Sequence, residues 1–598
     1  MSLPMKILKF FCFINLLSNF ILSSSLAVDP YSQALLSLKS EFIDDNNSLH
    51  DWVVPFGANL IESGSSYACS WSGIKCNNNS IVTSIDLSMK KLGGVLSGQL
   101  PAEFSELENL KILNLVENSF SGSIPFEYGS FRNLEFLLLA ENSLTGSIPP
   151  ELGNLKTVTH MEIGSNSYQG FIPPQLGNMS QLQYLDIAGA NLYGPIPKEL
   201  SNLTNLQSLF LFLNQLTGLI PNEFSKFKKL TYLDLSENFL SGSIPESFSE
   251  LKSLRFFCLM TNNMSGTVPE AIAELPSLES LLIWDNQFSG SLPKSLGKNS
   301  KLKWVDVSTN NFSGSIPSDV CLSGVLFKLI LFSNKFTGSL FSISKCSSLV
   351  RLCIEDNSFS GEIPLKFSHL PHIAYVDLSK NNFVGGIPLD ISLATRLEYF
   401  NVSYNMKLGG NIPSQIWSMP QVQNFSASSC GLLGNLPSFE SCKSISTIDL
   451  GRNNLYGTIP KSVSKCHALV AIKLSENNLT GQIPEELANI HILEIVDLSN
   501  NKFNGLIPEK FSSSSSLLLL NVSFNNISGS TPKGKSFTLM DSSAFVGNSE
   551  LCGVPFRPCI KSVGLLGSIG IWKITHTVLL SAGLLINLLI LGFGILHF

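Results

Sequence analysis

The chain carries little charge, and the charge that it has is not basic. Charged residues make up 14% of its 598 residues, and 39 Lys and Arg residues stand against 45 Asp and Glu residues, for a net charge of −6 at pH 7. No basic arm interrupts the sequence. A nucleic-acid-binding protein needs a basic patch to neutralise phosphates, so we expect no nucleic acid among the partners.

The sequence also lacks the motif sets of enzymes. Val470–Lys473 reads V-A-I-K, as in a protein kinase, but no glycine-rich phosphate loop, H-R-D or D-F-G accompanies it. Asp306 and Ser308 have no His base beside them. Five His residues are scattered over the chain without metal-ligand spacing, namely His160, His369, His372, His467 and His491. We therefore expect no enzymatic activity, no metal and no cofactor.

A repeat of 24 residues fills most of the chain. Residues 230–245 read LTYLDLSENFLSGSIP, which follows the template L-x-x-L-x-L-x-x-N-x-L-x-G-x-I-P. The Asn position of this template recurs every 24 residues from 118 to 334 and, with slips of one residue, continues to 525. With an incomplete first unit at 82–94, the spacing predicts about 19 repeats within residues 81–544.

Each repeat position has a physical role. The alternation in L-x-x-L-x-L predicts a short strand with Leu inward, and one such strand can bury its apolar face only against the next turn. The Asn amide can satisfy backbone groups where the chain leaves the strand. The predicted fold is therefore a leucine-rich-repeat solenoid, a curved and twisted superhelix with a concave parallel β-sheet, spanning about 90 Å along its arc.

Both ends of the array have caps with paired cysteines. The N-terminal cap, 28–80, has a predicted helix at Ala34–Phe42, and the C-terminal cap is 545–562. Each cap holds two Cys seven residues apart, Cys69 with Cys76 and Cys552 with Cys559. In an exported chain a disulfide is favoured over a metal site, since no His or second Cys pair joins either cap.

Repeat phase predicts the state of the other cysteines. Cys442 and Cys466 have the same phase on adjacent turns, and Cys321 and Cys346 are one turn apart, so both are predicted disulfides. Cys430 occupies an Asn position and is expected to be buried. Two further cysteines lie on outward strand positions four turns apart, which is too far to pair; these are Cys258 and Cys353.

The ends of the chain are apolar. Residues 1–27 read as a secretory signal peptide with cleavage after Ala27, in preference to a buried helix. Residues 563–598 are predicted to hold a single transmembrane helix without a cytoplasmic domain, because no charged residue occurs from Thr577 onward. A glycolipid-anchor signal and an incomplete gene product are the alternatives.

Export makes Asn-x-Ser/Thr sequons candidates for glycosylation. The eleven sequons lie at Asn46, Asn78, Asn178, Asn202, Asn263, Asn311, Asn401, Asn424, Asn478, Asn521 and Asn526.

Both caps and several stretches resemble the extracellular part of plant leucine-rich-repeat receptor kinases. The stretches are HMEIGSNSYQG (160–170), SLFLFLNQLTG (208–218), KLILFSNKFTG (328–338) and FSASSC (425–430). They are similar to the class that includes the receptor for tracheary-element differentiation inhibitory factor, a CLE peptide. The resemblance implies a concave face that binds a short secreted peptide. It also implies a SERK-type co-receptor near the C-terminal repeats and an extracellular ectodomain at the plasma membrane, carried on a single pass.

Outward strand positions in the middle of the array fit a peptide site. Large apolar side chains gather there, at Phe210, Phe212, Met260, Trp284, Trp304 and Phe332. Polar residues lie beside them, at Asp234, Asp306, Ser308, Ser333 and Glu355. Exposed aromatic residues on a rigid sheet are typical of binding hot spots. The alternative is that they only pack against one another.

One strand departs from the family pattern. CLE-peptide receptors carry Arg-x-Arg there, and the resemblance assigns this pair to the carboxylate at the end of the ligand. Here Ser348–Asn357 keeps Arg351, which we place at the edge of the strand, and has an outward Cys353 instead of the second Arg. The expected loss is about 1.5–3 kcal/mol of binding free energy, and Cys353→Arg is expected to restore it.

Two functions follow. The first is a cell-surface receptor-like protein that binds a CLE-type peptide or a co-receptor, or both, on its concave surface. It would not signal by itself and would act as a decoy or through the kinase of a partner. The alternative is a repeat module that recognises another extracellular protein, for example in defence. The aromatic cluster favours the first function, and the loss of the second Arg favours the second.

Overall fold

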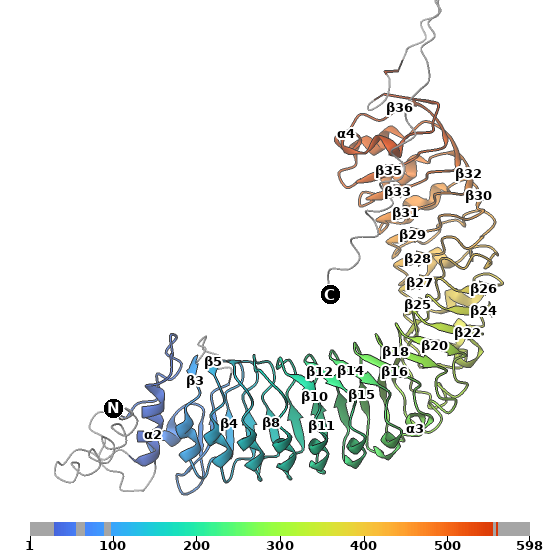
Figure 1. The fold of residues 1–598 in the computed structure, drawn as a ribbon. Coiled ribbons are helices and arrows are strands. Elements are labelled where there is room, and N and C mark those ends of the chain that lie inside the picture. The colour runs from blue at the N-terminus through green and yellow to red at the C-terminus, as the bar shows by residue number, and fades with distance from the viewer. Residues whose placement is uncertain (1–28, 55–65, 89–96, 554–557, 560–598) are drawn as a thin grey trace, which may run out of the picture.

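The chain forms a long solenoid of stacked turns. The computed structural model describes residues 29–54, 66–88, 97–553 and 558–559. The turns follow one another from the N-terminal cap to the C-terminal cap, and the stacking direction changes along the arc (Figure 1). The predicted signal peptide and membrane segment lie outside the described residues. Among the residues that are described, no helix is both long and apolar enough to cross a membrane.

A 20-stranded sheet, called here the main sheet, runs the length of the solenoid. Its first strand, β1 (Ile74–Cys76), is antiparallel to β2, and each later strand is parallel to the strand of the previous turn. Adjacent turns pair in register, as Tyr375↔Tyr399 and Asp377↔Asn401 illustrate. The strands after β1 are β2 (Val82–Asp86), β4 (Ile112–Asn114), β6 (Phe136–Leu138), β8 (His160–Glu162), β9 (Tyr184–Asp186), β11 (Ser208–Phe210), β13 (Tyr232–Asp234), β15 (Phe256–Cys258), β17 (Ser280–Leu282), β19 (Trp304–Asp306), β21 (Lys328–Ile330), β23 (Arg351–Cys353), β25 (Tyr375–Asp377), β27 (Tyr399–Asn401), β28 (Asn424–Ser426), β29 (Thr447–Asp449), β31 (Ala471–Lys473), β33 (Ile495–Asp497) and β35 (Leu519–Asn521).

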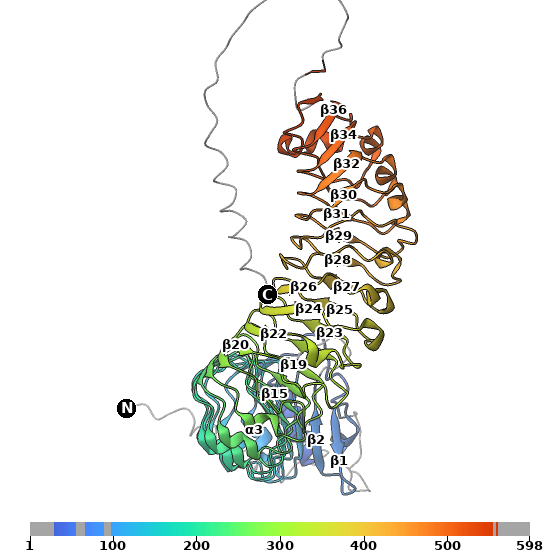
Figure 2. The same cartoon turned by 90° about the vertical axis from the view of Figure 1, so that its right-hand side faces the viewer.

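A second layer of strands follows the main-sheet strand of most turns. It forms three smaller parallel sheets. Figure 2 shows them beside the main sheet in the C-terminal half. Their strands are β3 (Ser97–Gln99), β5 (Ser119–Gly122) and β7 (Ser143–Leu144); β10 (Tyr193–Pro195), β12 (Gln215–Gly218), β14 (Phe239–Gly242), β16 (Asn263–Gly266), β18 (Gln287–Gly290), β20 (Asn311–Gly314), β22 (Lys335–Gly338), β24 (Ser358–Glu362) and β26 (Asn382–Val384); and β30 (Tyr456–Gly457), β32 (Asn478–Gln482), β34 (Lys502–Gly505), β36 (Asn526–Ser530) and β37 (Glu550–Cys552). Short 3-10 helices such as η6 (Pro174–Asn178) and η7 (Lys198–Asn202), with the α-helical turns α3 (Glu270–Ala273) and α4 (Lys535–Leu539), lead back toward the main sheet.

The core is one continuous column of apolar side chains between the two layers. In the repeat at 230–245, the template positions Leu230, Leu233, Leu235, Leu240 and Ile244 are all buried. One turn cannot enclose these side chains, so each turn is stabilised mainly by its neighbours. The main sheet is thereby held as a rigid surface.

Buried Asn side chains join each turn to the previous one. The amide nitrogen of Asn381 donates to the carbonyls of Leu378 and Ser379 in its own turn and to Ile354 in the turn before. Its amide oxygen accepts from the N–H of Phe359, also in the turn before. Cys430 stands at an Asn position and is buried as predicted, with its sulfur beside the carbonyl of Val402. This ladder fixes the spacing between turns.

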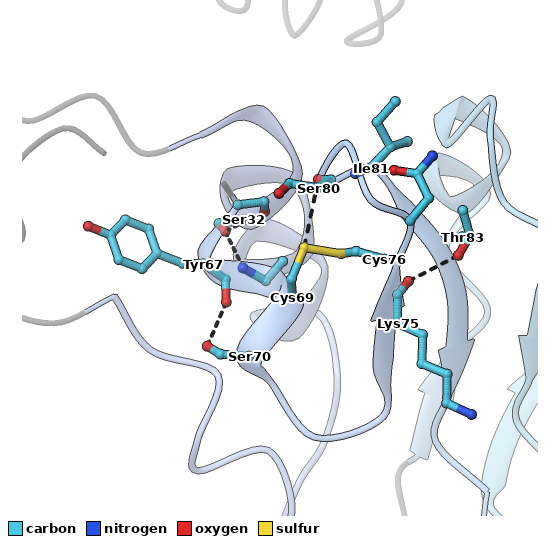
Figure 3. Close-up of a disulfide and its surroundings, with 12 residues drawn as sticks. Ser32, Tyr67, Cys69, Ser70, Lys75, Cys76, Ser80, Ile81 and Thr83 are labelled. Atoms are coloured by element: carbon cyan, nitrogen blue, oxygen red, sulfur yellow. Dashed lines mark hydrogen bonds between the residues drawn. A yellow bond between two sulfur atoms is a disulfide. The ribbon is translucent and has the colours of Figure 1, made fainter. Parts of the chain in front are cut away.

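The N-terminal cap begins with a helix that starts earlier than predicted. Helix α2 spans Pro30–Lys39, whereas the sequence predicted Ala34–Phe42. The carboxylate of Asp29 accepts the N–H of Ser32, and Pro30 occupies the first helical position, where its missing N–H costs nothing. Strand β1 and the 3-10 helix η2 (Tyr67–Ser70) are joined by the Cys69–Cys76 disulfide (Figure 3).

The structure contains the disulfides that the sequence predicts in the caps and between adjacent turns. They join Cys69–Cys76 and Cys552–Cys559 in the caps, and Cys321–Cys346 and Cys442–Cys466 between adjacent turns of the array. Cys258 and Cys353 are unpaired, as expected from their separation, but both are buried and therefore not exposed on the outward face.

The Asn ladder gives a direct test of what holds the turns together. Asn381→Ala removes one acceptor and three donor contacts, all buried, and we expect the free energy of unfolding to fall by about 2–4 kcal/mol. Denaturant unfolding followed by circular dichroism measures the change. The neighbouring and exposed Asn382→Ala is the matched control. Equal stability of the two variants would contradict a structural role for the ladder.

Candidate functional site

The open face of the main sheet presents three side chains per turn. The first and third residues of each strand face away from the core, as does the residue two positions beyond the strand. The second residue is buried, as Leu209 is in β11. We call these side chains the first, third and fifth rows and the surface that they form the concave face. In the C-terminal half, strands β25 to β35 lie on the inner side of the arc (Figure 1).

Most of the residues that the sequence singled out lie in these rows between β11 and β23. They are half-buried or exposed, so their side chains form a continuous apolar and polar surface in the middle of the array. Trp304 and Arg351 belong to the first row, Phe210 and Asp234 to the third row, and Phe212, Met260, Trp284, Phe332 and Glu355 to the fifth row.

Two predicted site residues are buried, and a third lies outside the rows. Asp306 is 7% exposed and Ser308 is 1% exposed, and the Ser308 hydroxyl donates to the Asp306 carboxylate at 2.7 Å. The same Asp-x-Ser bond recurs at Asp234–Ser236 and Asp377–Ser379, which identifies it as a structural feature of the repeat. Ser333 lies in the turn before Asn334, outside the rows, and donates to the Asp356 carboxylate.

Arg351 lies at the edge of its strand, as predicted, and covers Cys353. Arg351 opens strand β23 and is exposed on the concave face, whereas Cys353 is 2% exposed beneath it. The Arg351 Nε donates to the Cys353 sulfur at 3.3 Å. Burial raises the pKa of Cys353 to about 12, so the thiol is neutral. Cys353 has the outward phase that the sequence predicted, but the expected exposure is wrong because Arg351 covers it. Its replacement by Arg would place a charge at this covered position.

Sequence reasoning missed an aromatic stack at the N-terminal end of the concave face. Phe136, His160 and Tyr184 occupy the first row of consecutive turns, with ring centroids 4.7 and 5.7 Å apart. Tyr184 also contacts Phe210 at 5.4 Å. All three missed residues share the 24-residue phase of Trp304, which would have identified them. The aromatic surface thus extends further toward the N-terminus than predicted.

Two cations in the first row lie against aromatic rings. The Lys328 amino group is 4.3 Å from the ring centroid of Trp304, and the Arg351 guanidinium carbon is 4.2 Å from that of Tyr375. Tyr375 stacks on Tyr399 in the next turn, with centroids 4.2 Å apart. The first row therefore reads aromatic, cation, cation, aromatic, aromatic across five adjacent strands. We call these five residues the cationic row.

Burial raises the pKa values of two carboxyl groups near the cationic row. Burial raises the pKa of Glu355 to about 7, and the charge of Asp377 adds to this shift. One oxygen of the Glu355 carboxyl is buried and has no hydrogen-bond partner. Burial also raises the pKa of Asp306, against hydrogen bonds from Ser308 that lower it. Below about pH 7 the Glu355 carboxyl is therefore mostly protonated and adds little negative charge beside the row.

The V-A-I-K tetrapeptide lies in an ordinary repeat strand. Ala471–Lys473 form β31, in which Ile472 is a buried core residue and Lys473 a third-row side chain. Within the ranges that the structure describes, no cluster of His, Cys, Asp and Glu side chains could hold a metal ion.

Sequence-family comparisons identify the repeat and its N-terminal cap. Residues 204–264 match the family described as "Leucine rich repeat", and residues 32–77 match "Leucine rich repeat N-terminal domain". Among curated proteins of Arabidopsis thaliana, the chain is 32% identical to a probable LRR receptor-like serine/threonine-protein kinase, RPK1, over 129 residues. It is 36% identical to MDIS1-interacting receptor like kinase 1 over 121 residues. The first match covers 14% of this chain and 22% of RPK1, and the second covers 20% of this chain and 11% of its relative. Each match therefore spans less than a quarter of the length of the curated relative.

Solved structures give the broader match. A TDR receptor is 43% identical, with a TM-score of 0.73 over 77% of this chain and 80% of that one. The Arabidopsis receptor kinase HAESA, solved with the peptide hormone IDA and the co-receptor SERK1, is 32% identical. Its TM-score is 0.68 over 90% of this chain and 99% of that one.

The fold and these matches therefore define a leucine-rich-repeat receptor ectodomain. The chain belongs to the family of plant leucine-rich-repeat receptor kinase ectodomains, with relatives among the peptide-hormone receptors. An ectodomain of this family is extracellular, and no catalytic domain is recognised in the matched regions.

The Glu355 carboxyl makes a testable link between pH and stability. Its pKa is raised from 4.5 to about 7 in the folded chain. The folded state therefore binds more protons than the unfolded state between these values, and the free energy of unfolding falls as pH rises through that window. After a discount for solvent screening, Glu355 accounts for about 1–2 kcal/mol of this fall in the free energy of unfolding.

Glu355→Gln removes this dependence. We expect the thermal midpoint of the variant, relative to that of the parent chain, to increase as pH rises from 5 to 8. Differential scanning fluorimetry measures both midpoints. Glu398→Gln, at an exposed position one turn beyond β25, is the matched control. A Glu355→Gln curve parallel to the parent curve would refute the buried, neutral carboxyl.

Proposed function

We propose that the concave face between β6 and β27 binds a short secreted peptide of the CLE type. The observation that carries the proposal is the cationic row, Trp304, Lys328, Arg351, Tyr375 and Tyr399. Its two cations are held on aromatic faces, and neither forms an ion pair with another described residue. An unpaired Arg beside an unpaired Lys favours a carboxylate ligand.

The length of the surface fits an extended peptide. Adjacent parallel strands are about 4.8 Å apart, so the eight strand spacings from Tyr184 in β9 to Tyr375 in β25 cover about 38 Å before curvature. A 12-residue extended chain spans about 40 Å. Half-buried aromatic residues along this length provide apolar contact area, and the cationic row receives the terminal carboxylate.

Two relatives support a peptide as the ligand. HAESA was solved in complex with the peptide hormone IDA and the co-receptor SERK1. RGFR1, 26% identical with a TM-score of 0.53, was solved with RGF2 and is described as a plant peptide hormone receptor. We extend peptide binding, a SERK-type co-receptor and a plasma-membrane location to this chain as part of the proposal. The decoy role concerns the C-terminal end, outside the described residues, and stays a prediction.

Arg351 is the residue that tests the proposal. Arg351→Ala should weaken binding of a free-acid CLE peptide about 10- to 100-fold, as expected for a charged hydrogen bond of about 1.5–3 kcal/mol. The same peptide with an amidated C-terminus should bind the parent chain more weakly by a similar factor and be insensitive to Arg351→Ala. Isothermal titration of the full chain against a panel of synthetic 12-residue CLE peptides measures both effects.

The matched control is Arg452→Ala. Arg452 is exposed on a turn further along the array and is paired with Glu476, outside the concave rows. This variant should bind as the parent does. A panel without any saturable binding would refute the peptide function and leave the alternative, a module that recognises another extracellular protein.

A further inference from the structure

Three glycosylation sequons lie on the concave face, all in its C-terminal part. Asn401 is a third-row residue of β27, Asn424 a first-row residue of β28 and Asn521 a third-row residue of β35. The open faces of the strands from β4 to β25 carry no sequon. Six of the other sequons lie away from this face, at the ends of 3-10 helices or in the second layer, namely Asn178, Asn202, Asn263, Asn311, Asn478 and Asn526.

Asn401 and Asn424, the two concave sequons nearest to the cationic row, differ in how their amide nitrogens are used. The Asn401 Nδ2 donates to the Asp377 carboxylate at 3.0 Å and lies 3.4 Å from the Tyr399 hydroxyl. For Asn424, only the amide oxygen is bonded, to the Ser446 hydroxyl. Its Nδ2 makes no hydrogen bond within the described part of the chain, and it is not among the buried atoms that lack a partner, so it reaches solvent. Asn424 is therefore the concave sequon next to the cationic row that is open to a bulky substituent.

We propose that Asn424 carries an N-linked glycan and that this glycan bounds the ligand-binding part of the concave face at its C-terminal end. Asn424 pairs in register with Tyr399, the last residue of the cationic row. Arg351 lies three strands away, about 14 Å along the sheet. A glycan is bulky and solvated, so it excludes a ligand from the face beyond β27. The part of this inference that concerns a ligand rests on the proposed function.

The modification needs only what an exported chain meets during secretion. The donor is an oligosaccharide joined to a lipid through a diphosphate. The bond between the anomeric carbon of the sugar and the diphosphate oxygen breaks, and a bond from that carbon to the Asn424 Nδ2 forms. One proton leaves Nδ2, and the lipid diphosphate departs. Ser426 completes the Asn-Phe-Ser sequon that directs this transfer.

Glycan occupancy is the first test. The full chain is expressed in plant cells and digested, and the peptides are analysed by mass spectrometry with and without enzymatic deglycosylation. We expect more than half of the molecules to carry a glycan at Asn424. Asn478, in the second layer, is the internal control that the chain was exported. An Asn424 peptide that is bare while Asn478 is glycosylated overturns the proposal.

The second test asks whether the glycan shields the neighbouring part of the concave face. Ser426→Ala abolishes the sequon and leaves Asn424 in place, so hydroxyl-radical labelling of Tyr399 should rise at least twofold. Thr480→Ala removes the Asn478 glycan instead and should leave Tyr399 labelling unchanged. Equal labelling of Tyr399 in the parent chain and in Ser426→Ala would show that the Asn424 glycan does not shield this part of the concave face. Neither test uses a peptide, so a glycosylated Asn424 in a chain that binds no peptide refutes only the proposed function.

Discussion

The hydrogen bonds between neighbouring turns set every other feature of this molecule. In the turn of Asn381, one buried amide joins two turns, accepting from Phe359 and donating to Ile354. Where the ladder position holds Cys430, the sulfur contacts the carbonyl of the turn before, and Asn453 accepts the Cys430 N–H. Because each turn is fixed at one strand spacing from the next, a residue type repeated in phase becomes a line of touching side chains. The stacked rings of Tyr375 and Tyr399 are such a line.

The same regular spacing gathers positive charge and aromatic side chains in the middle of the concave face, although the chain as a whole carries little charge. Some cations on other parts of the array form ion pairs, as Arg255 and Lys303 do with Glu279. Lys328 and Arg351 instead rest on aromatic rings. The nearest acid of the fifth row, Glu355, has a pKa raised to about 7 by burial. The middle of the concave face therefore offers positive charge and aromatic area together, which suits the end of an acidic or carboxylate-terminated peptide.

Repeat phase is enough to predict the fold, the Cys442–Cys466 disulfide and most members of the rows, because each depends only on position within a turn. The cap disulfides follow instead from the seven-residue spacing of their cysteines. Repeat phase could also have found Phe136, His160 and Tyr184, which share the phase of Trp304. Repeat phase could not predict how deeply each side chain of a row is buried. Cys353 has outward phase but lies buried beneath Arg351, and Asp306 has outward phase but is also buried, whereas Asp234 in the same row is half-exposed. Depth depends on the size and direction of neighbouring side chains, and a single sequence does not encode these in its spacing.

The central claim is that a peptide lies along the concave face with its C-terminus at the cationic row. Photo-crosslinking tests it most directly, with CLE-type peptides that carry a benzophenone next to the C-terminal residue and mass spectrometry to map the attachment. The account predicts saturable crosslinks to residues of β19 to β25, competed by unlabelled peptide. Competed crosslinks confined to the second layer or to the outer 3-10 helices would contradict it.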